Sequence, residues 1–289
     1  MSRPSVVVPP RAVRAVAEAA AVVPPPHVIH VLDVRDAEAF ARGHLPGAGH
    51  MALAEWGPRR MELPARTVPL LVVHDDPARA RHAAHQLAER GYERIMWLDR
   101  PLSDEAEGFA SLAPPARLWS PSEFLLRALP GSPHGAGRAL DLACGSGRAA
   151  VHMASLGWQV EAWDLDSSAL EMAEAFAARN GVRIATRICD LESMALPDPA
   201  EHFNAIVVIR YLHRPLFPWI ERALAPGGAL VYETFRTGQE VFGHPRKARH
   251  LLEPGELLRA FPSLHVELHE ESPEHESPVM ARVLASKPD

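Results

Sequence analysis

The stretch Arg138-Ala-Leu-Asp-Leu-Ala-Cys-Gly-Ser-Gly-Arg148 decides how the second half of this 289-residue chain is expected to fold. Its apolar part predicts a short buried strand over residues 139–143, and Gly145 and Gly147 predict a tight turn directly after it. The apolar run over residues 149–156 then predicts a helix. Such a turn lets the backbone approach a ligand closely, and the free amides of the first helical turn favour an anionic group. The stretch therefore predicts a nucleotide-type pocket.

Two further acids follow at the ends of the next two predicted strands. The run over residues 158–164 ends in Asp164, which is placed to accept hydrogen bonds from ribose hydroxyls. The strand predicted over residues 182–188 is followed by Asp190, where a carboxylate can accept from an adenine amine. Asp141 lies in the first strand of the series. We expect the three acids and the two glycines to converge at one edge of a parallel sheet.

This order of glycine loop, ribose acid and adenine acid resembles the class I S-adenosylmethionine-dependent methyltransferases. Leu224-Ala-Pro-Gly-Gly228 is similar to the turn before that family's fifth strand. A dinucleotide dehydrogenase would have a third glycine at Ala150, although its fingerprint sometimes allows alanine. The sequence departs from most of the methyltransferases at Ala143, where they have the first glycine of the loop. Within the family, Glu161-Ala-Trp-Asp164 and the run over residues 253–258 resemble the tellurite-resistance and thiopurine type.

The resemblance implies a Rossmann-like α/β domain with a seven-stranded sheet and S-adenosyl-L-methionine as its cofactor. Alternating helices and strands along residues 139–285 independently favour a parallel sheet covered on both faces, with a closing hairpin. Carried over position by position, the cofactor-binding residues are expected to be Asp141, Ala143, Gly145, Gly147, Asp164, Leu165, Asp190 and Leu191.

The acceptor is expected at the ends of the fourth and fifth strands of this domain, near residues 210–214 and 233–236. Tyr211 and His213 are our candidates for positioning the acceptor or removing its proton. An alternative that fits His213 equally well is a helix cap or simple packing. The basic segment over residues 243–250 is either a guide for an anionic acceptor or an ordinary polar loop. No pair among the 16 histidines has compact ligand spacing with a third partner, so we predict no metal.

The first half of the chain resembles the rhodanese-like domain. The strand ending in Asp33 and Arg35, a helix over residues 38–40 and the run Gly43-His-Leu-Pro-Gly-Ala48 carry this resemblance. A strand over residues 69–73, a helix over 78–90 and a strand over 92–98 follow. Upstream, the alanine-rich run over residues 12–23 predicts a short helix.

In rhodaneses the loop after the strand over residues 69–73 carries a catalytic cysteine, and the resemblance puts His74 at that position. The chain has no cysteine before Cys144, and persulfide chemistry needs a thiolate. We therefore expect a degenerate rhodanese fold without sulfur transfer. His74, Asp75 and Asp76 are interpreted as a solvated loop rather than as a new site.

Composition, net charge and cysteine count limit the class of protein to which the chain can belong. The chain is 47% hydrophobic with a net charge of −6, and it has two cysteines, which predict no disulfide framework and fit a reducing compartment. No apolar run approaches a membrane span, and the proline-rich start does not fit a signal peptide, so we expect a cytoplasmic protein with no membrane contact. The charge argues against a broad nucleic-acid surface without excluding a local one.

We predict a rhodanese-like domain over residues 1–103, a linker over 104–117 and a methyltransferase domain over 118–289. Ser120 is expected to cap a helix over residues 119–129, near which Trp119 either lines the cofactor pocket or packs in the core. The predicted function is methyl transfer to a small molecule, with a thiol or a chalcogen oxyanion as candidates. A methyltransferase of tRNA or another macromolecule and a non-catalytic cofactor-binding protein are the alternatives, and a homodimer is left open.

Overall fold

The computed structural model describes residues 14–16, 30–102, 111–129, 137–192, 196 and 202–289. The chain divides into two compact units, Met1–Ser120 and Pro121–Asp289, and each is described by itself.

The first unit contains a five-stranded parallel sheet in the order β1-β5-β4-β2-β3. Strand β4 is buried at every position, as expected for the centre of a sheet covered on both faces. The strands are β1 (Arg14–Val16), β2 (His30–Asp33), β3 (Ala48–His50), β4 (Leu70–Val73) and β5 (Ile95–Leu98). The helices and 3-10 turns of this unit are α1 (Ala37–Arg42), η1 (Leu53–Glu55), η2 (Arg60–Glu62) and α2 (Pro77–Glu89).

Two aspartates start the two helices of the first unit. The carboxylate of Asp36 accepts from the Ala39 amide at 2.7 Å at the start of α1. Asp76 accepts from the Ala78 amide at 2.9 Å, and Pro77 occupies the first turn of α2. A cap of this kind satisfies an amide that has no partner within the helix.

The helix predicted over residues 12–23 is wrong at residues 14–16, which form β1 and pair with β5. The remaining residues of that run lie outside the described residues. Alanine favours a helix by only a fraction of a kilocalorie per residue, so pairing with the sheet edge outweighs it.

The segment before Ser120 packs on the first unit, although most of it was predicted to be a linker. Ser111 exchanges two backbone hydrogen bonds with His44, at 3.2 and 2.8 Å, and the Ala116 amide donates to Ala48 at 2.9 Å. Leu118 is 5% exposed in the first unit's core. Trp119 is buried beneath the guanidinium of Arg117, and both residues belong to the first compact unit. The second compact unit begins at Pro121, and the domain bounds predicted from the sequence stay a prediction.

The second unit contains a seven-stranded sheet in the order β11-β12-β10-β9-β6-β7-β8, in which β12 is antiparallel to both of its neighbours and the other pairs are parallel. The strands are β6 (Arg138–Leu142), β7 (Gln159–Asp164), β8 (Ala185–Ile188), β9 (Phe203–Ile209), β10 (Leu224–Phe235), β11 (His265–Glu271) and β12 (Met280–Ser286). The helices and 3-10 turns are α4 (Glu123–Ala128), α5 (Arg148–Ser155), α6 (Ser167–Arg179), η4 (Arg214–Leu216), α7 (Phe217–Ala223), α8 (Gln239–Phe242), η5 (Ala248–His250) and α9 (Glu256–Arg259).

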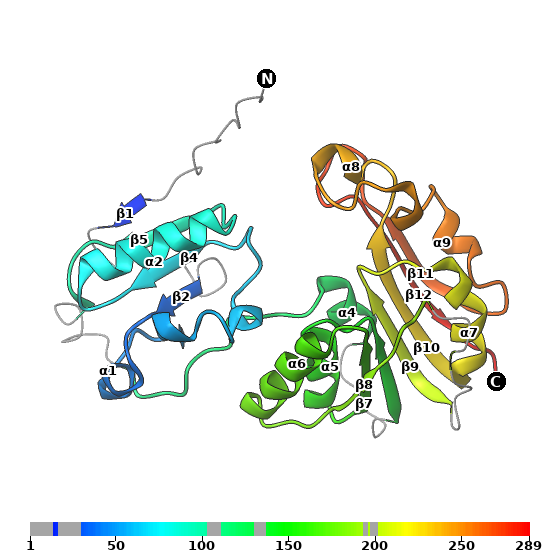
Figure 1. Cartoon of the computed structure of the whole chain (residues 1–289), viewed down its shortest axis with the longest axis horizontal. Helices are drawn as coiled ribbons and strands as arrows, with labels where there is room; N and C mark the ends of the chain where they lie inside the picture. Colours follow the sequence, from blue (N-terminus) through cyan, green and yellow to red (C-terminus); the bar gives the residue numbers. More distant parts are fainter. Residues whose placement is uncertain (1–13, 17–29, 103–110, 130–136, 193–195, 197–201) are drawn as a thin grey trace. The chain divides into compact units, whose positions relative to one another are not determined.

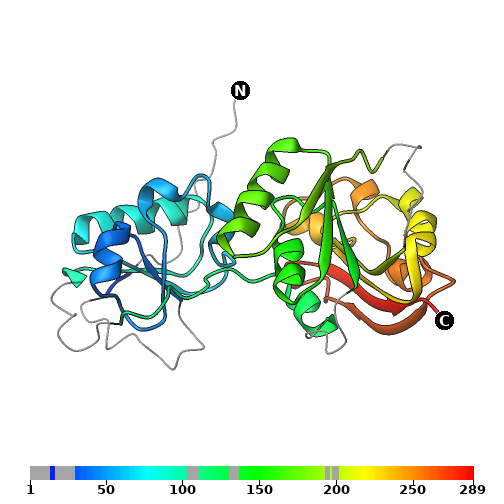
Figure 2. The ribbon, with the colours of Figure 1, turned by 90° about the horizontal axis from the view of Figure 1, so that it is seen from below.

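Strand residues alternate between two cores on opposite faces of this sheet. Leu140 and Leu142 of β6 pack with α7 and α9, whereas Ala139 packs with α4 and α5. Figure 1 shows α5 and α6 on the side of the sheet opposite to α7 and α9, and Figure 2 shows the same arrangement from below. The alternation also turns Asp141 toward α5.

Helix α4 begins later than predicted, because Ser122 rather than Ser120 is its N-cap. The Ser122 hydroxyl accepts from the Leu125 amide at 3.3 Å and donates to a carboxylate oxygen of Glu233 at 2.7 Å. The hydrogen bond to Glu233 ties the start of α4 to strand β10, and it therefore favours Ser122 over Ser120 as the cap.

Candidate functional site

The glycine loop between β6 and α5 turns through three positive φ angles. They are 54° at Ala143, 53° at Gly145 and 80° at Gly147. A Cβ at Gly147 would lie 2.7 Å from the Cβ of Ala173 on α6, so this position requires glycine for its conformation and for close helix packing. Ala143 adopts the left-handed conformation despite its side chain, so alanine here strains the backbone by about 1–2 kcal/mol.

Asp164, at the end of β7, holds the glycine loop in place. One carboxylate oxygen accepts from the Gly145 amide at 2.7 Å, and the other accepts from the Asp166 amide at 3.0 Å. The neighbouring Cys144 amide donates to the Trp163 carbonyl at 3.1 Å. The structure thus brings together two residues that the sequence predicts for the same site. The next residue, Leu165, is 65% exposed.

Asp141 lies buried beneath the loop. It is 2% exposed, and its carboxylate accepts from the Ala150 amide at 2.9 Å near the start of α5. Burial raises the pKa of Asp141 to about 7, and the negative charge of Asp164 adds to the effect. Burial and the charge of Asp164 therefore disfavour the ionised form of Asp141, and a cationic ligand group next to this carboxylate would stabilise it.

Asp190 follows β8 at the same edge of the sheet. The Cys189 amide donates to the Asp164 carbonyl at 2.9 Å, which continues the strand pairing past Ile188. The Asp190 side chain is exposed and accepts from the Glu192 amide at 3.0 Å. Leu191 is 5% exposed and packs into the core instead. Asp190 is therefore available to a ligand, whereas Leu191 supports the loop from below.

Tyr211, just beyond β9, connects this edge with the expected acceptor side. Burial raises the pKa of Tyr211 to about 12, and the charges of Glu192, Asp190 and Asp164 add to the rise. The phenol is therefore protonated at neutral pH and can donate a hydrogen bond, but it is a poor general base. This narrows the role predicted for Tyr211 to positioning.

His213 directly precedes η4 and is its N-cap residue, and its carbonyl accepts from the Leu216 amide at 3.0 Å. The predicted alternative of a helix cap therefore describes the backbone of His213, whereas its imidazole makes no cap hydrogen bond. With Leu212, the imidazole lines a hollow of about 300 Å³ in the second unit. The other residues that line the hollow are Glu192, Arg214, Pro215, Arg249 and His250.

Two charged residues of the segment 233–236 are engaged within the second unit. Glu233 is 6% exposed and accepts from Ser122 at 2.7 Å and from Arg282 at 3.3 Å. Arg236 is buried and donates to the Ser272 carbonyl at 2.7 Å. The expectation that this segment meets the acceptor stays a prediction.

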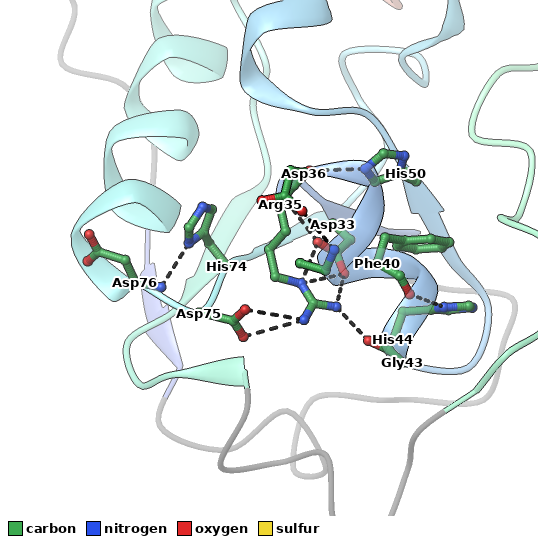
Figure 3. Close-up of polar contacts among 11 residues, drawn as sticks. Asp33, Arg35, Asp36, Phe40, Gly43, His44, His50, His74, Asp75 and Asp76 are labelled. Atoms are coloured by element: carbon green, nitrogen blue, oxygen red, sulfur yellow. Dashed lines mark hydrogen bonds and ion pairs between the residues drawn. The ribbon is translucent and has the colours of Figure 1, made fainter.

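The loop after β4 in the first unit is closed by its own hydrogen bonds (Figure 3). The Asp76 amide donates to Nδ1 of His74 at 2.8 Å, and the guanidinium of Arg35 lies 3.4 Å from Asp75. Arg35 also binds the buried carboxylate of Asp33 at 2.7 Å. Only three residues separate β4 from α2, and the side chains of His74 and Asp75 are already paired with the Asp76 amide and with Arg35.

Two family models match the chain. A rhodanese-like domain matches residues 16–103, and a methyltransferase domain matches residues 139–228. This chain joins a rhodanese-like domain to a methyltransferase domain. The methyltransferase match covers the strands that carry Asp141, Asp164 and Asp190, and the rhodanese-like match covers the loop that carries His74.

The methyltransferase domain accounts for similarity to several curated proteins. The ubiquinone biosynthesis O-methyltransferase of Bordetella pertussis is 30% identical over 155 residues, which cover 48% of this chain and 63% of that protein. The probable S-adenosyl-L-methionine-dependent methyltransferase TehB of Haemophilus influenzae is 25% identical over 83 residues, 29% of either chain. The crystal structure of TehB from Haemophilus influenzae gives a TM-score of 0.48 at 17% identity and covers 58% of this chain and 62% of that one. The chain thus spans less than two thirds of each of these relatives.

Among the described residues, no group of three or more His, Cys, Asp and Glu side chains is arranged to hold a metal ion. No helix in this part of the chain is both long and apolar enough to cross a membrane.

Proposed function

We propose that the methyltransferase domain transfers a methyl group from S-adenosyl-L-methionine to a small-molecule acceptor. The observation that carries the proposal is the meeting of Asp141, Asp164 and Asp190 with the glycine loop at one edge of the sheet. The names of the relatives, two of which are an O-methyltransferase of ubiquinone biosynthesis and TehB, support methyl transfer without fixing this chain's acceptor.

The residues at this edge fit the cofactor. Asp141 is a buried carboxylate whose pKa is raised to about 7, and it suits an ammonium group that restores its ionisation. Asp164 would accept from the ribose hydroxyls while it keeps the loop in place through Gly145. Asp190, which is exposed beside it, would accept from the adenine amine. Gly145 leaves open space where a side chain would stand, since nothing lies within 4 Å of an added Cβ.

When bound, the cofactor supplies a methyl carbon on a positively charged sulfur. The acceptor's lone pair forms a bond to that carbon as the carbon–sulfur bond breaks, and sulfur keeps the electron pair. Alignment of the two reactants is the main contribution of the protein, and proximity alone supplies about 7–11 kcal/mol in favourable cases. Tyr211 would orient the acceptor as a hydrogen-bond donor, and His213 would take a proton from an acceptor that must lose one.

Calorimetric binding of S-adenosylmethionine tests the cofactor site. We expect Asp190→Ala to weaken binding by about tenfold, the effect of losing one or two hydrogen bonds to a ligand. Asp164→Ala is expected to weaken it further, because this change also frees the Gly145 amide. Glu171→Gln, on the exposed surface of α6, is the matched control. Unchanged affinity in both aspartate variants would remove their assigned roles.

Transfer of a labelled methyl group tests the reaction itself. Thiols, phenols, chalcogen oxyanions and RNA are the acceptors to compare. Labelling of a small molecule supports the proposal, and labelling of RNA alone would favour the macromolecular alternative. Tight cofactor binding without labelling of any acceptor would favour a non-catalytic cofactor-binding protein.

A further inference from the structure

We propose that the hollow beside Tyr211 binds the carboxylate of an organic-acid acceptor, with Arg249 as the residue that recognises the negative charge. The inference rests on the proposed methyl transfer and names the class of its acceptor. It depends on four features of the hollow. They are the wall held by Arg214, the positive charge of Arg249, the acidic Glu192 near the cofactor edge, and the volume.

The wall that presents Arg249 is held by a second arginine. Arg214 binds Glu256 through Nε at 2.5 Å and through Nη2 at 2.8 Å. The same guanidinium donates to the Arg249 carbonyl at 3.1 Å and to the Leu251 carbonyl at 2.9 Å. Five donors in a rigid fork make arginine suited to fixing several acceptors at once. Arg214 thus joins η4 to the segment that carries Arg249, and the pairing with Glu256 neutralises its charge.

Arg249 retains an uncompensated positive charge. Its side chain is exposed and donates from Nε to Nε2 of His250 at 3.0 Å. Within the described residues, no carboxylate lies within salt-bridge distance of this guanidinium. The partner of that bond is an imidazole, which carries no negative charge and so does not neutralise the guanidinium. The two terminal nitrogens of Arg249 match the two oxygens of a carboxylate.

The hollow is also lined by an acidic residue, Glu192. Its amide donates to Asp190, the acid assigned to the adenine, and its charge acts on Tyr211. An anion is therefore disfavoured next to Glu192 and favoured next to Arg249. This polarity orients an organic acid with its carboxylate away from the cofactor edge. The rest of the molecule, including the group to be methylated, then lies toward Glu192, in a hollow that His213 also lines.

The size of the hollow favours an organic molecule over a bare inorganic oxyanion. Its volume of about 300 Å³ equals the liquid volume of roughly ten water molecules. It also lies at the lower end of the range found for small-molecule pockets. Leu212 and Pro215 provide apolar contact surface for a carbon skeleton.

The experiment uses the full chain saturated with S-adenosylhomocysteine and two pairs of probes in which a neutral hydroxymethyl group replaces the carboxylate. The pairs are 4-hydroxybenzoate with 4-hydroxybenzyl alcohol, and 3-mercaptopropionate with 3-mercaptopropanol. We expect calorimetry to show tighter binding of at least one acid than of its alcohol, by about tenfold. Arg249→Ala should abolish this preference, and Arg249→Lys should retain part of it. Arg246→Ala, an exposed arginine that does not line the hollow, should leave the preference intact.

Three results would overturn the inference. They are equal binding of acid and alcohol, an acid preference that Arg249→Ala leaves unchanged, and no binding of either acid up to about 10 mM. Labelled methyl transfer is measured separately with the same four probes, so transfer to an alcohol and its acid at equal rates would refute the charge selection while supporting methyl transfer. Failure of the full chain to bind S-adenosylhomocysteine at all would overturn the proposed function and this inference with it.

Discussion

Replacing Asp141 by asparagine should change how the stability of the unliganded protein depends on pH. The pKa of Asp141 is raised in the fold from 3.8 to about 7, chiefly by burial. Between these two pH values the folded chain holds a proton that the unfolded chain releases. The free energy of unfolding therefore falls as pH rises from about 4 to about 7, and it stays low above that range.

The size of the effect follows from the shift. A difference of roughly three pKa units corresponds to about 4 kcal/mol, which is an upper bound because buried groups relax and admit water. The asparagine amide oxygen can still accept from the Ala150 amide, so the main hydrogen bond is kept. At pH 8.5 we expect Asp141→Asn to be more stable than the unchanged protein, and at pH 5 we expect less than half of that difference, because only part of the range from 3.8 to about 7 has then been crossed.

Urea unfolding of the full chain at several pH values between about 5 and 8.5 measures the effect. Glu171→Gln on the surface of α6 is the control, and its curve should run parallel to that of the unchanged protein. S-adenosylhomocysteine, which carries an ammonium group, should reverse the order at pH 8.5 by binding the aspartate form more tightly. Parallel pH profiles for Asp141→Asn and the unchanged protein would refute the assignment of a raised pKa to this carboxyl.

Three further changes test other parts of the structure. Ala143→Gly should stabilise the second unit by about 1 kcal/mol, because glycine adopts the positive φ at this position without strain. Ala178→Gly on the exposed face of α6 is the control and should destabilise the unit by about 1 kcal/mol. Urea unfolding measures both changes, and a loss of stability in both variants would refute backbone strain at Ala143. Ser122→Ala should lower the free energy of unfolding by about 1–2 kcal/mol, because it removes the helix cap and the hydrogen bond to Glu233. A thermal midpoint equal to that of the unchanged protein would show that neither hydrogen bond stabilises the fold. The first unit should show no thiosulfate sulfurtransferase activity. His74→Cys alone should not create it, because Asp75 and Asp76 in the three-residue loop disfavour an anionic sulfur donor, and a robust rate from either protein would refute this.

The alternation of apolar strands with helices was enough to predict the architecture of both units. The strands predicted over residues 139–143, 158–164 and 182–188 appear within a few residues of their expected places as β6, β7 and β8. A buried parallel strand such as β6 leaves a nearly continuous apolar run, whereas β8 is largely exposed and begins three residues later than predicted. The three errors have a common cause. Each depends on a partner that is distant in the sequence, which local propensity cannot predict. The three features are β1, the Ser122 cap and the packed segment over residues 111–119.

Some residues of the candidate site could likewise be predicted from the sequence, and others could not. Asp141, Asp164 and Asp190 could be found from the sequence because strand order alone brings them to one edge. The hollow that Glu192 and Arg249 line could not, since it is assembled from segments nearly sixty residues apart and Arg214 fixes its wall. The acceptor role expected of residues 233–236 stays a prediction, and the fold adds that Glu233 is paired with Arg282 and that Arg236 is bound to the Ser272 carbonyl.

The way Leu118 fits against Gly49 determines where the two domains can be separated. A side chain at position 49 would collide with Leu118, so the leucine occupies the room that the glycine leaves. A fragment that stops at the end of the rhodanese-like family match, residue 103, would expose this apolar groove to water and remove the backbone bond between Ala116 and Ala48. Proteolytic or recombinant preparation of the first domain should therefore retain the chain through Ser120, and shorter fragments should aggregate.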